Sequence, residues 1–116
     1  MEEKQSIAAL AALAQETRLR VFRLLVQAGH DGLVVGEIAA ATGTAPATLS
    51  FHLKNLAQAG LIVARNEGRF IRYSADYSAM TALLRYLTEN CCGGLGCETF
   101  VDAVDPACQC SPSETA

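Results

Sequence analysis

A chain of 116 residues with a formal net charge of −3 is long enough for one domain with a single core. Its hydrophobic fraction of 51% suits a globular protein, yet no apolar run reaches the length that a membrane span needs, so we expect no membrane partner. The start, Met-Glu-Glu-Lys, lacks the basic and then apolar pattern of a signal peptide, and we therefore expect a cytoplasmic protein.

The N-terminal part of the chain predicts two helices. Residues 6–14 form an alanine-rich helix with a narrow apolar stripe, too thin to fold alone, after a frayed start at residues 1–5. Residues 17–28 predict a stronger helix that Gly29 closes. The stripe of the first helix and the core candidates of the second are Ile7, Leu10, Leu13, Leu19, Phe22, Leu25 and Val26.

Residues 34–60 have the pattern of a helix, a tight turn and a second helix. Apolar side chains at helical spacing predict the first helix, and Gly43 lies where the chain must turn. Pro46 suits the first turn of the second helix, because its missing N–H costs nothing there. The side chains that this second helix buries are Leu49, Leu53 and Leu56. Its opposite face and flanks carry Thr48, Ser50, Phe51, His52, Lys54 and Asn55.

A hairpin and a last helix follow. The runs Leu61–Arg65 and Arg69–Tyr73 are rich in β-branched and aromatic residues and predict two strands with a turn at residues 66–68. Tyr77–Asn90 predicts an amphipathic helix. The order is then α-α-α-α-β-β-α, a mainly α (α+β) fold of the winged helix-turn-helix type. We expect a domain over residues 1–90, followed by a cysteine-rich segment and flexible tail over 91–116.

A winged helix-turn-helix usually places one helix in the major groove of DNA. The charge distribution agrees, because residues 48–75 hold four basic side chains against Glu67 alone, whereas acidic residues accumulate toward the C-terminus. We expect Thr48 at base edges, Lys54 and Asn55 at phosphates, and the arginines at phosphates or in the minor groove. For His52 the alternative is a structural role beside a neighbouring loop. The predicted DNA contacts are Thr48, Ser50, Phe51, His52, Lys54, Asn55, Arg65, Arg69 and Arg72.

The run VGEIAAATGTAPATLSFHLKNLAQAGLIVARNEGRFIRYS resembles the DNA-binding core of the ArsR/SmtB metalloregulatory repressors, and AALAQETRLRVFRLL resembles that family's entry helices. The resemblance implies a homodimer that pairs its first and last helices across a two-fold axis. Such a dimer reads an inverted repeat in double-stranded operator DNA, with half-sites about one helical turn, roughly 34 Å, apart. Phe51 and the start Ala45–Ala47 depart from the family's more polar pattern, which affects the operator sequence and not the mode of binding.

All five cysteines lie in the last 26 residues. In a cytoplasmic protein this clustering favours ligation or redox sensing over a disulfide framework. No histidine follows His52, so any metal site in this segment is built from thiolates, which select soft ions. Trivalent arsenic and antimony take three thiolates in a pyramid. The cysteines are Cys91, Cys92, Cys97, Cys108 and Cys110.

The resemblance narrows the expected ligand set. The family's zinc and nickel site on the last helix is absent, because YSAMTALLRYLTEN has no histidine, and VVGEIA replaces the cysteine-bearing ELCVC-like motif. What remains resembles the arsenical repressors with a vicinal cysteine pair and a third cysteine near the C-terminus. Carried over to this chain, the ligands are Cys91, Cys92 and Cys97, with Cys108 or Cys110 as alternates for the third. The expected inducer is trivalent arsenic or antimony, with no obligatory cofactor.

Three alternatives stay open at this point. A repressor of the same fold could respond to thiol oxidation or polysulfide, or to cadmium, lead or zinc. A winged helix can also serve as a protein-interaction module or a metal carrier. An enzyme is not expected, because the sequence has no phosphate loop, no paired carboxylates in a plausible cleft and no Cys/His nucleophile constellation.

Overall fold

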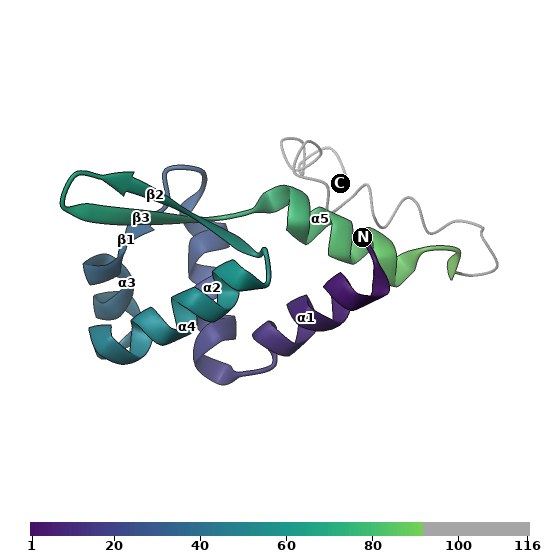
Figure 1. The fold of residues 1–116 in the computed structure, drawn as a ribbon, viewed down its shortest axis with the longest axis horizontal. Coiled ribbons are helices and arrows are strands. Elements are labelled where there is room, and N and C mark those ends of the chain that lie inside the picture. Colours follow the sequence, from purple (N-terminus) through teal and green to yellow (C-terminus); the bar gives the residue numbers. More distant parts are fainter. Residues whose placement is uncertain (92–116) are drawn as a thin grey trace, which may run out of the picture.

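The computed structural model describes residues 1–91, which form five helices and a small antiparallel sheet (Figure 1). This confirms the predicted mainly helical fold with a helix-turn-helix and a hairpin wing, and it adds one strand, β1, to the predicted order. The elements are α1 (Glu3–Leu13), α2 (Glu16–Ala28), β1 (Leu33–Val34), α3 (Val35–Thr42), α4 (Pro46–Gln58), β2 (Ile62–Glu67), β3 (Phe70–Ala75) and α5 (Tyr77–Thr88).

Helix α1 begins earlier than predicted and turns a different face inward. The backbone N–H of Glu2 donates to the Oε1 atom of Gln5 at 2.9 Å, so the chain is helical from Glu3 and the predicted frayed start is wrong there. Small side chains face the core, because they let α1 approach its neighbours closely. These buried residues are Ser6, Ala9 and Ala12. Two residues of the predicted stripe instead lie outward, with Ile7 59% and Leu10 42% exposed, whereas Leu13 is half-buried and packs against the core as predicted.

The central core joins α2, α3 and α4. Leu49, Leu53 and Leu56 of α4 are fully buried, as their spacing predicts. They meet Ile38 from α3 and a stripe of α2 whose buried members are Val21, Phe22 and Leu25. The prediction that Leu19 belongs to the core is wrong, because its side chain is 44% exposed. Packing against α2 and α3 therefore holds α4 at a defined angle, with its other face outward.

The sheet contains a two-residue strand that the sequence pattern did not predict. Its order is β1-β3-β2, with Leu33 opposite Tyr73 and Val34 opposite Arg72. Two residues are too few to show the alternation that marks a strand. Gly32 allows the approach, because a Cβ there would lie 2.1 Å from the backbone oxygen of Tyr73. The strand β1 therefore ties the middle of the hairpin to the start of α3.

The hairpin is longer than predicted, and its turn is later. Strands β2 and β3 pair from Ile62 opposite Ala75 to Glu67 opposite Phe70, which leaves Gly68 and Arg69 as a two-residue loop. Gly68 has a φ of +68°, and glycine at the first of two loop positions is the pattern of a type II′ turn. The predicted turn at residues 66–68 is therefore wrong by about two residues, since Asn66 and Glu67 belong to the ladder.

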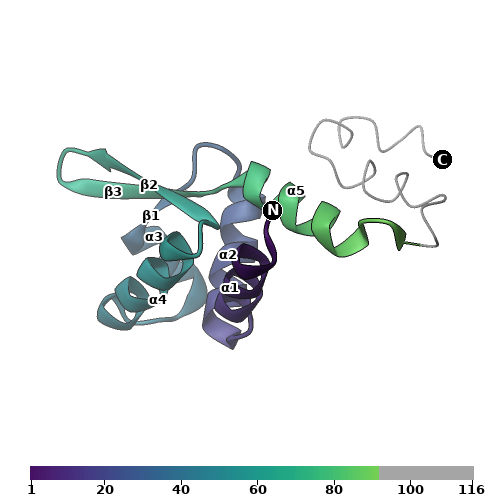
Figure 2. The ribbon, with the colours of Figure 1, turned by 45° about the vertical axis from the view of Figure 1, so that its right-hand side comes forward.

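Helix α5 extends away from the helix-turn-helix. The Oδ1 atom of Asp76 accepts from the backbone N–H of Ala79 at 3.0 Å and caps its start. The hydroxyl of Tyr77 donates to the backbone oxygen of Val26 at 2.8 Å and anchors that start to α2. Figures 1 and 2 both place α5 at one end of the molecule and the hairpin tip at the other. No helix within residues 1–91 is long and apolar enough to cross a membrane.

Candidate nucleic-acid interface

Helix α4 presents a polar and aromatic outer face beside the hairpin. Ala45 and Pro46 start the helix in extended and then helical geometry, and its leucines fix the inner face. Phe51 is 61% exposed on the outer side. The Nδ2 atom of Asn55 donates to the backbone oxygen of Phe51 at 3.0 Å, so this amide lies along the helix flank. The predicted contact residues that lie exposed on α4 are Thr48, Ser50, Phe51 and Lys54.

His52 does not lie on that outer face, and the prediction that it does is wrong. Its side chain is only 8% exposed, because it lies on the side of α4 that faces α2. The guanidinium NH1 of Arg18 donates to its Nδ1 atom at 3.3 Å. An arginine is always a donor, so Nδ1 must be the unprotonated nitrogen of a neutral ring. Burial first, and then the positive charge of Arg18, lowers the pKa of His52 below its ordinary value.

Arg18 links three helices and was not among the predicted site residues. Its Nε atom donates to the backbone oxygen of Ala12 at the end of α1, at 2.7 Å, while NH1 reaches His52 on α4. The arginine therefore satisfies a helix-terminal carbonyl and an imidazole together. The sequence offers little signal for this contact, because Arg18 and His52 are separated by 34 positions.

The three arginines of the hairpin have different surroundings. Arg69 lies exposed in the turn, and within residues 1–91 it makes no hydrogen bond or ion pair. Arg72 instead forms an ion pair with Glu67, with its Nε atom 2.9 Å from Oε1, and NH1 donates to the backbone oxygens of Asp31 and Gly32 at 3.4 Å. The hydrogen bond from Arg72 lowers the pKa of the Glu67 carboxyl below its usual value.

Arg65 shares this anchoring role. Its NH2 atom donates to the backbone oxygen of Asp31 at 3.2 Å, on the same sheet face as Arg72, its partner across the strands. The structure therefore does not bring the three arginines together at the tip. Arg65 and Arg72 hold the middle of the hairpin to the loop before β1, and Arg69 alone projects from the turn.

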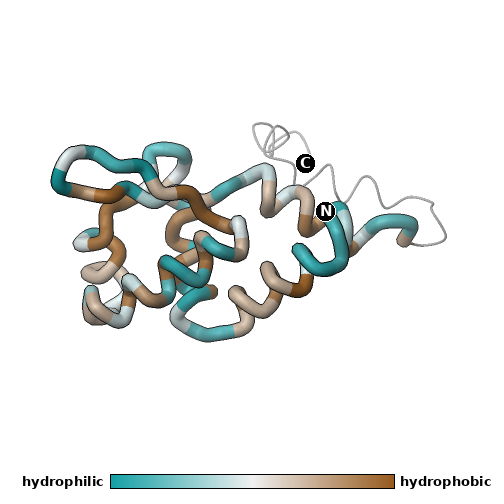
Figure 3. The backbone as a smooth tube through the Cα atoms, in the orientation of Figure 1, coloured by the Kyte–Doolittle hydropathy of each residue, from teal (hydrophilic) through white to brown (hydrophobic). Residues whose placement is uncertain are grey.

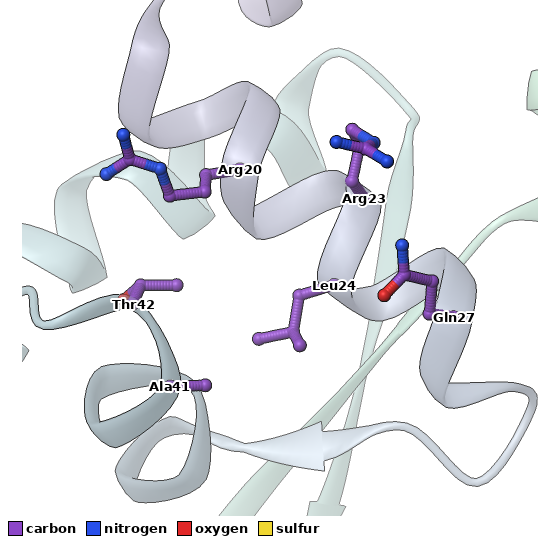
Figure 4. A pocket seen from close by; sticks show the side chains of 6 residues that line it. All are labelled: Arg20, Arg23, Leu24, Gln27, Ala41 and Thr42. Atoms are coloured by element: carbon purple, nitrogen blue, oxygen red, sulfur yellow. The ribbon is translucent and has the colours of Figure 1, made fainter.

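A second basic surface lies between α2 and α3. It is a depression of about 200 Å³, and Figure 4 shows the guanidinium groups of Arg20 and Arg23 pointing apart above Leu24. Arg20 also pairs with Glu16 on the same helix. The residues that line the depression are Arg20, Arg23, Leu24, Gln27, Ala41 and Thr42. Neither α4 nor the hairpin contributes to it, so it is separate from the predicted reading face.

The predicted cysteine site lies almost entirely outside the described residues. Cys91 is the last described residue and follows the end of α5 at Thr88. Cys92, Cys97, Cys108 and Cys110 lie beyond it. Within residues 1–91, no group of three or more histidine, cysteine, aspartate or glutamate side chains could hold a metal ion. The predicted thiolate ligand set and the boundary at residue 90 therefore stay predictions.

Known proteins resemble the part of the chain that carries this geometry. A family model described as a helix-turn-helix domain matches residues 13–65. A Halobacterium salinarum protein named as an arsenical resistance operon repressor, ArsR, is 34% identical over 67 residues, which cover 58% of this chain. The match spans about half, 51%, of that relative's length.

Two solved structures have the same fold and related sequences. One is the homodimeric winged helix-turn-helix DNA-binding domain of a possible ArsR-family transcriptional regulator from Mycobacterium bovis. It is 31% identical, with a TM-score of 0.61, and the match covers 75% of this chain and 81% of that one. The other is a possible transcriptional regulator for arsenical resistance, 34% identical with a TM-score of 0.61, where the match covers 71% and 81%. The helix-turn-helix, the hairpin wing and these relatives together establish that the chain belongs to the ArsR family of transcriptional regulators.

Proposed function

We propose that this chain is a homodimeric transcriptional repressor that binds an operator and is released when trivalent arsenic or antimony binds its C-terminal thiolates. The outer face of α4 carries the DNA-binding part of the proposal. This face is held by a fully buried leucine stripe, and it leaves Thr48, Ser50 and Lys54 exposed beside a hairpin whose tip holds Arg69. A polar helix face next to a basic wing suits the major groove of DNA and the neighbouring phosphate backbone.

Each element takes a distinct part in the proposed contact. The first half of α4, with Thr48 and Ser50, is placed against base edges, and Phe51 offers an apolar contact of the kind that a thymine methyl accepts. Lys54 and Asn55 are placed at phosphates. Arg69 at the hairpin tip is placed at the backbone or in the minor groove. Arg65 and Arg72 contribute positive charge while they hold the wing in position.

The dimer part of the proposal rests on the end of the molecule formed by α1 and α5, which contact each other. Ile7, Leu10 and Leu87 are 59%, 42% and 53% exposed there. Figure 3 shows that α1 is hydrophobic along most of its length. Large apolar side chains gathered at one end favour a buried partner, and a second copy supplies the matching face. The Mycobacterium bovis relative is described as homodimeric.

The inducer part rests on the cysteines and on the names of two relatives. Three thiolates suit trivalent arsenic, and the relatives named above are described by arsenical resistance. Cys91 follows α5 within three residues, so an ion held by Cys91, Cys92 and Cys97 would act at the end of a proposed dimer helix. Couplings between sites of about 1–3 kcal/mol would lower DNA affinity about 5- to 150-fold.

A binding titration tests the whole proposal. The apo protein selects a duplex from a random pool, and fluorescence anisotropy then follows that duplex while arsenite is added. We expect arsenite to release the DNA, and less effectively at lower pH because ligation displaces protons. Cys91→Ser, Cys92→Ser and Cys97→Ser should each abolish release, whereas the matched variants Cys108→Ser and Cys110→Ser should keep it.

Other outcomes separate the alternatives. Failure to bind any duplex at low salt would remove the repressor function and favour a protein-interaction module or metal carrier. Release by peroxide or polysulfide but not by arsenite would favour the thiol-redox response. Release by cadmium, lead or zinc but not by arsenite would keep the thiolate site and change its ion. Loss of the arsenite response in Cys108→Ser, with Cys97→Ser unaffected, would reassign the third ligand.

A further inference from the structure

The space between α1 and α4 contains a depression of about 260 Å³, and Asn55 is the one predicted DNA contact among its described lining residues. We call it the α1–α4 depression, and its lining residues are Ala8, Ala11, Ala12, Arg18, Asn55, Gln58 and Ala59. Four alanines keep it open, because their methyl groups fill little of the space between the helices. Among the described lining residues, Arg18 is the only charged one.

Arg18 is held in place before any ligand arrives. The Nε atom donates to the backbone oxygen of Ala12 at 2.7 Å, and NH1 donates to the Nδ1 atom of His52 at 3.3 Å. A guanidinium has five N–H donors, so these two contacts leave three for a ligand. Holding the side chain in one position removes much of the rotamer entropy that binding would otherwise cost.

The chemistry of the rim matches an oxyanion. Asn55 and Gln58 are about one helical turn apart on α4, and both line the depression with Arg18. The Nδ2 atom of Asn55 already donates one N–H to the backbone oxygen of Phe51 at 3.0 Å, so Asn55 offers its second N–H to a ligand and Gln58 offers its N–H₂ group. His52 cannot compensate the arginine's charge, because it is neutral when it accepts this hydrogen bond. A net positive, donor-rich depression with an apolar floor favours a small anion with several acceptor oxygens, and phosphate fits that description.

We propose that the α1–α4 depression is a seat for a phosphate group, held by Arg18, Asn55 and Gln58. The phosphate has two sources, the DNA backbone or a free phosphate. The DNA source rests on the proposed function: Asn55 and Gln58 belong to α4, so a seated backbone phosphate would flank the groove that α4 enters. It would extend the interface from α4 onto α2, beyond the contacts that the sequence predicts.

The test uses variants that change the rim and spare the internal contacts. Arg18→Ala removes the guanidinium, but it also removes the bonds to Ala12 and His52, so thermal unfolding must accompany it. Gln58→Glu places a negative charge at the exposed rim without touching either bond. Gln27→Glu is the matched control, because it makes the same change on an exposed residue that lines the other depression, between α2 and α3.

Two measurements identify the source of the phosphate. The first is the affinity of the full chain for a mixed-sequence duplex across a series of salt concentrations. The slope of log K against log salt is negative, and its magnitude counts the phosphates that the protein contacts. Loss of one backbone phosphate contact from each protomer should reduce that magnitude by about 0.9 per protomer in Gln58→Glu and Arg18→Ala. The slope of Gln27→Glu should stay at the wild-type value. The second is an NMR titration with inorganic phosphate, with chloride at equal ionic strength as the control.

The outcomes are distinct from those of the proposed function. A reduced salt slope supports the seat with DNA as its source. Saturable phosphate shifts at the Asn55 and Gln58 side-chain amides of the wild type, with the Asn55 shift lost in Gln58→Glu and the salt slope unchanged, support the seat with free phosphate as its source. A wild-type slope together with no phosphate shifts overturns the seat. If the wild-type chain binds no duplex, the proposed function fails, and the phosphate titration alone then decides the seat.

Discussion

The imidazole of His52 is a buried base held neutral by its surroundings. Its Nδ1 atom accepts from Arg18, and protonation would place a positive charge beside a guanidinium in a poorly hydrated site. A histidine in a reading helix therefore supports the position of that helix, and it does so only in its neutral form. The residue acts through Arg18 and Ala12, at the junction of α1, α2 and α4.

This arrangement predicts that the protein loses stability in mild acid. The pKa of His52 is lowered in the folded protein, so the unfolded chain binds more protons at His52, and stability at this site rises with pH. The contribution is fully present above the unfolded value of about 6.5 and is lost as the pH falls through the folded pKa. Urea unfolding at pH 7.5 and pH 5 measures it.

His52→Gln provides the control for that measurement. The Gln Oε1 atom can still accept from Arg18 but does not titrate, so the variant should lose less stability than the wild type over the same pH step. Equal losses in the two proteins would contradict the role assigned to His52.

We expect Arg69→Ala to weaken DNA binding without changing stability, and Arg72→Ala to weaken the structure around the hairpin. Arg69 has no partner within residues 1–91, so Arg69→Ala should leave the unfolding free energy within about 0.5 kcal/mol of the wild-type value. It should also reduce the magnitude of the salt slope of DNA binding by about 0.9 for each lost phosphate contact. Arg72→Ala removes an ion pair and contacts to the loop before β1, so it should loosen the pairing of β1 with the hairpin. Hydrogen exchange at Leu33 and Val34 checks that loosening. An unchanged salt slope in Arg69→Ala would exclude the hairpin tip from the interface.

At the scale of elements, the wing depends on a single close approach between backbones. β1 reaches β3 only because Gly32 has no Cβ, and this contact joins the loop after α2 to the centre of the sheet. Arg65 and Arg72 then bond to that loop. The hairpin is thus held at its middle while its tip stays exposed, which suits an element that must present a side chain to a large partner.

Gly32→Ala should therefore destabilise the protein more than Gly68→Ala. Both glycines have a φ of +68°, so both substitutions carry the left-handed cost of roughly 1–2 kcal/mol. Only at Gly32 does the new Cβ meet a backbone oxygen, at 2.1 Å, whereas nothing lies within 4 Å of one at Gly68. The difference between the two unfolding free energies isolates the close approach. Equal losses would show that β1 moves away from β3 without cost.

At the scale of the whole molecule, the two ends have different tasks in the proposed dimer. The hairpin tip lies at one end and α5 at the other (Figure 2), while α1 packs against α2 and α4 as well as α5. In a two-fold dimer joined through α1 and α5, any change in the packing of these helices moves two reading heads relative to each other. An inducer site near the end of α5 would then act on the spacing of the heads without touching α4.

The dimer makes a prediction about oligomeric state. Leu10→Glu places a charge on the exposed apolar face of α1 and should shift the protein toward monomer in analytical ultracentrifugation. The matched control is Leu19→Glu, because Leu19 is 44% exposed and Leu10 is 42% exposed, but Leu19 lies on α2. A dimer that survives Leu10→Glu, or that is lost only in Leu19→Glu, would place the interface elsewhere.

The sequence by itself determined the elements whose signals are local. Leu49, Leu53 and Leu56 repeat at helical spacing, and Gly43 and Gly60 mark the ends of helices, so α3 and α4 and the turn between them were predicted closely. The family resemblance rests on the same stretch. Periodicity and turn chemistry need only neighbours along the chain, and for that reason they can be read without the fold.

The tertiary structure alone decided which side of each element became a site. His52 faces Arg18, which lies 34 positions away in the chain. Arg72 is anchored by Gly32, which lies 40 positions away. The burial of alanines rather than Ile7 and Leu10 on α1 was decided by how closely its neighbours approach. Such choices follow from the packing of several elements at once, because a side chain's environment is set by whatever surrounds it in space.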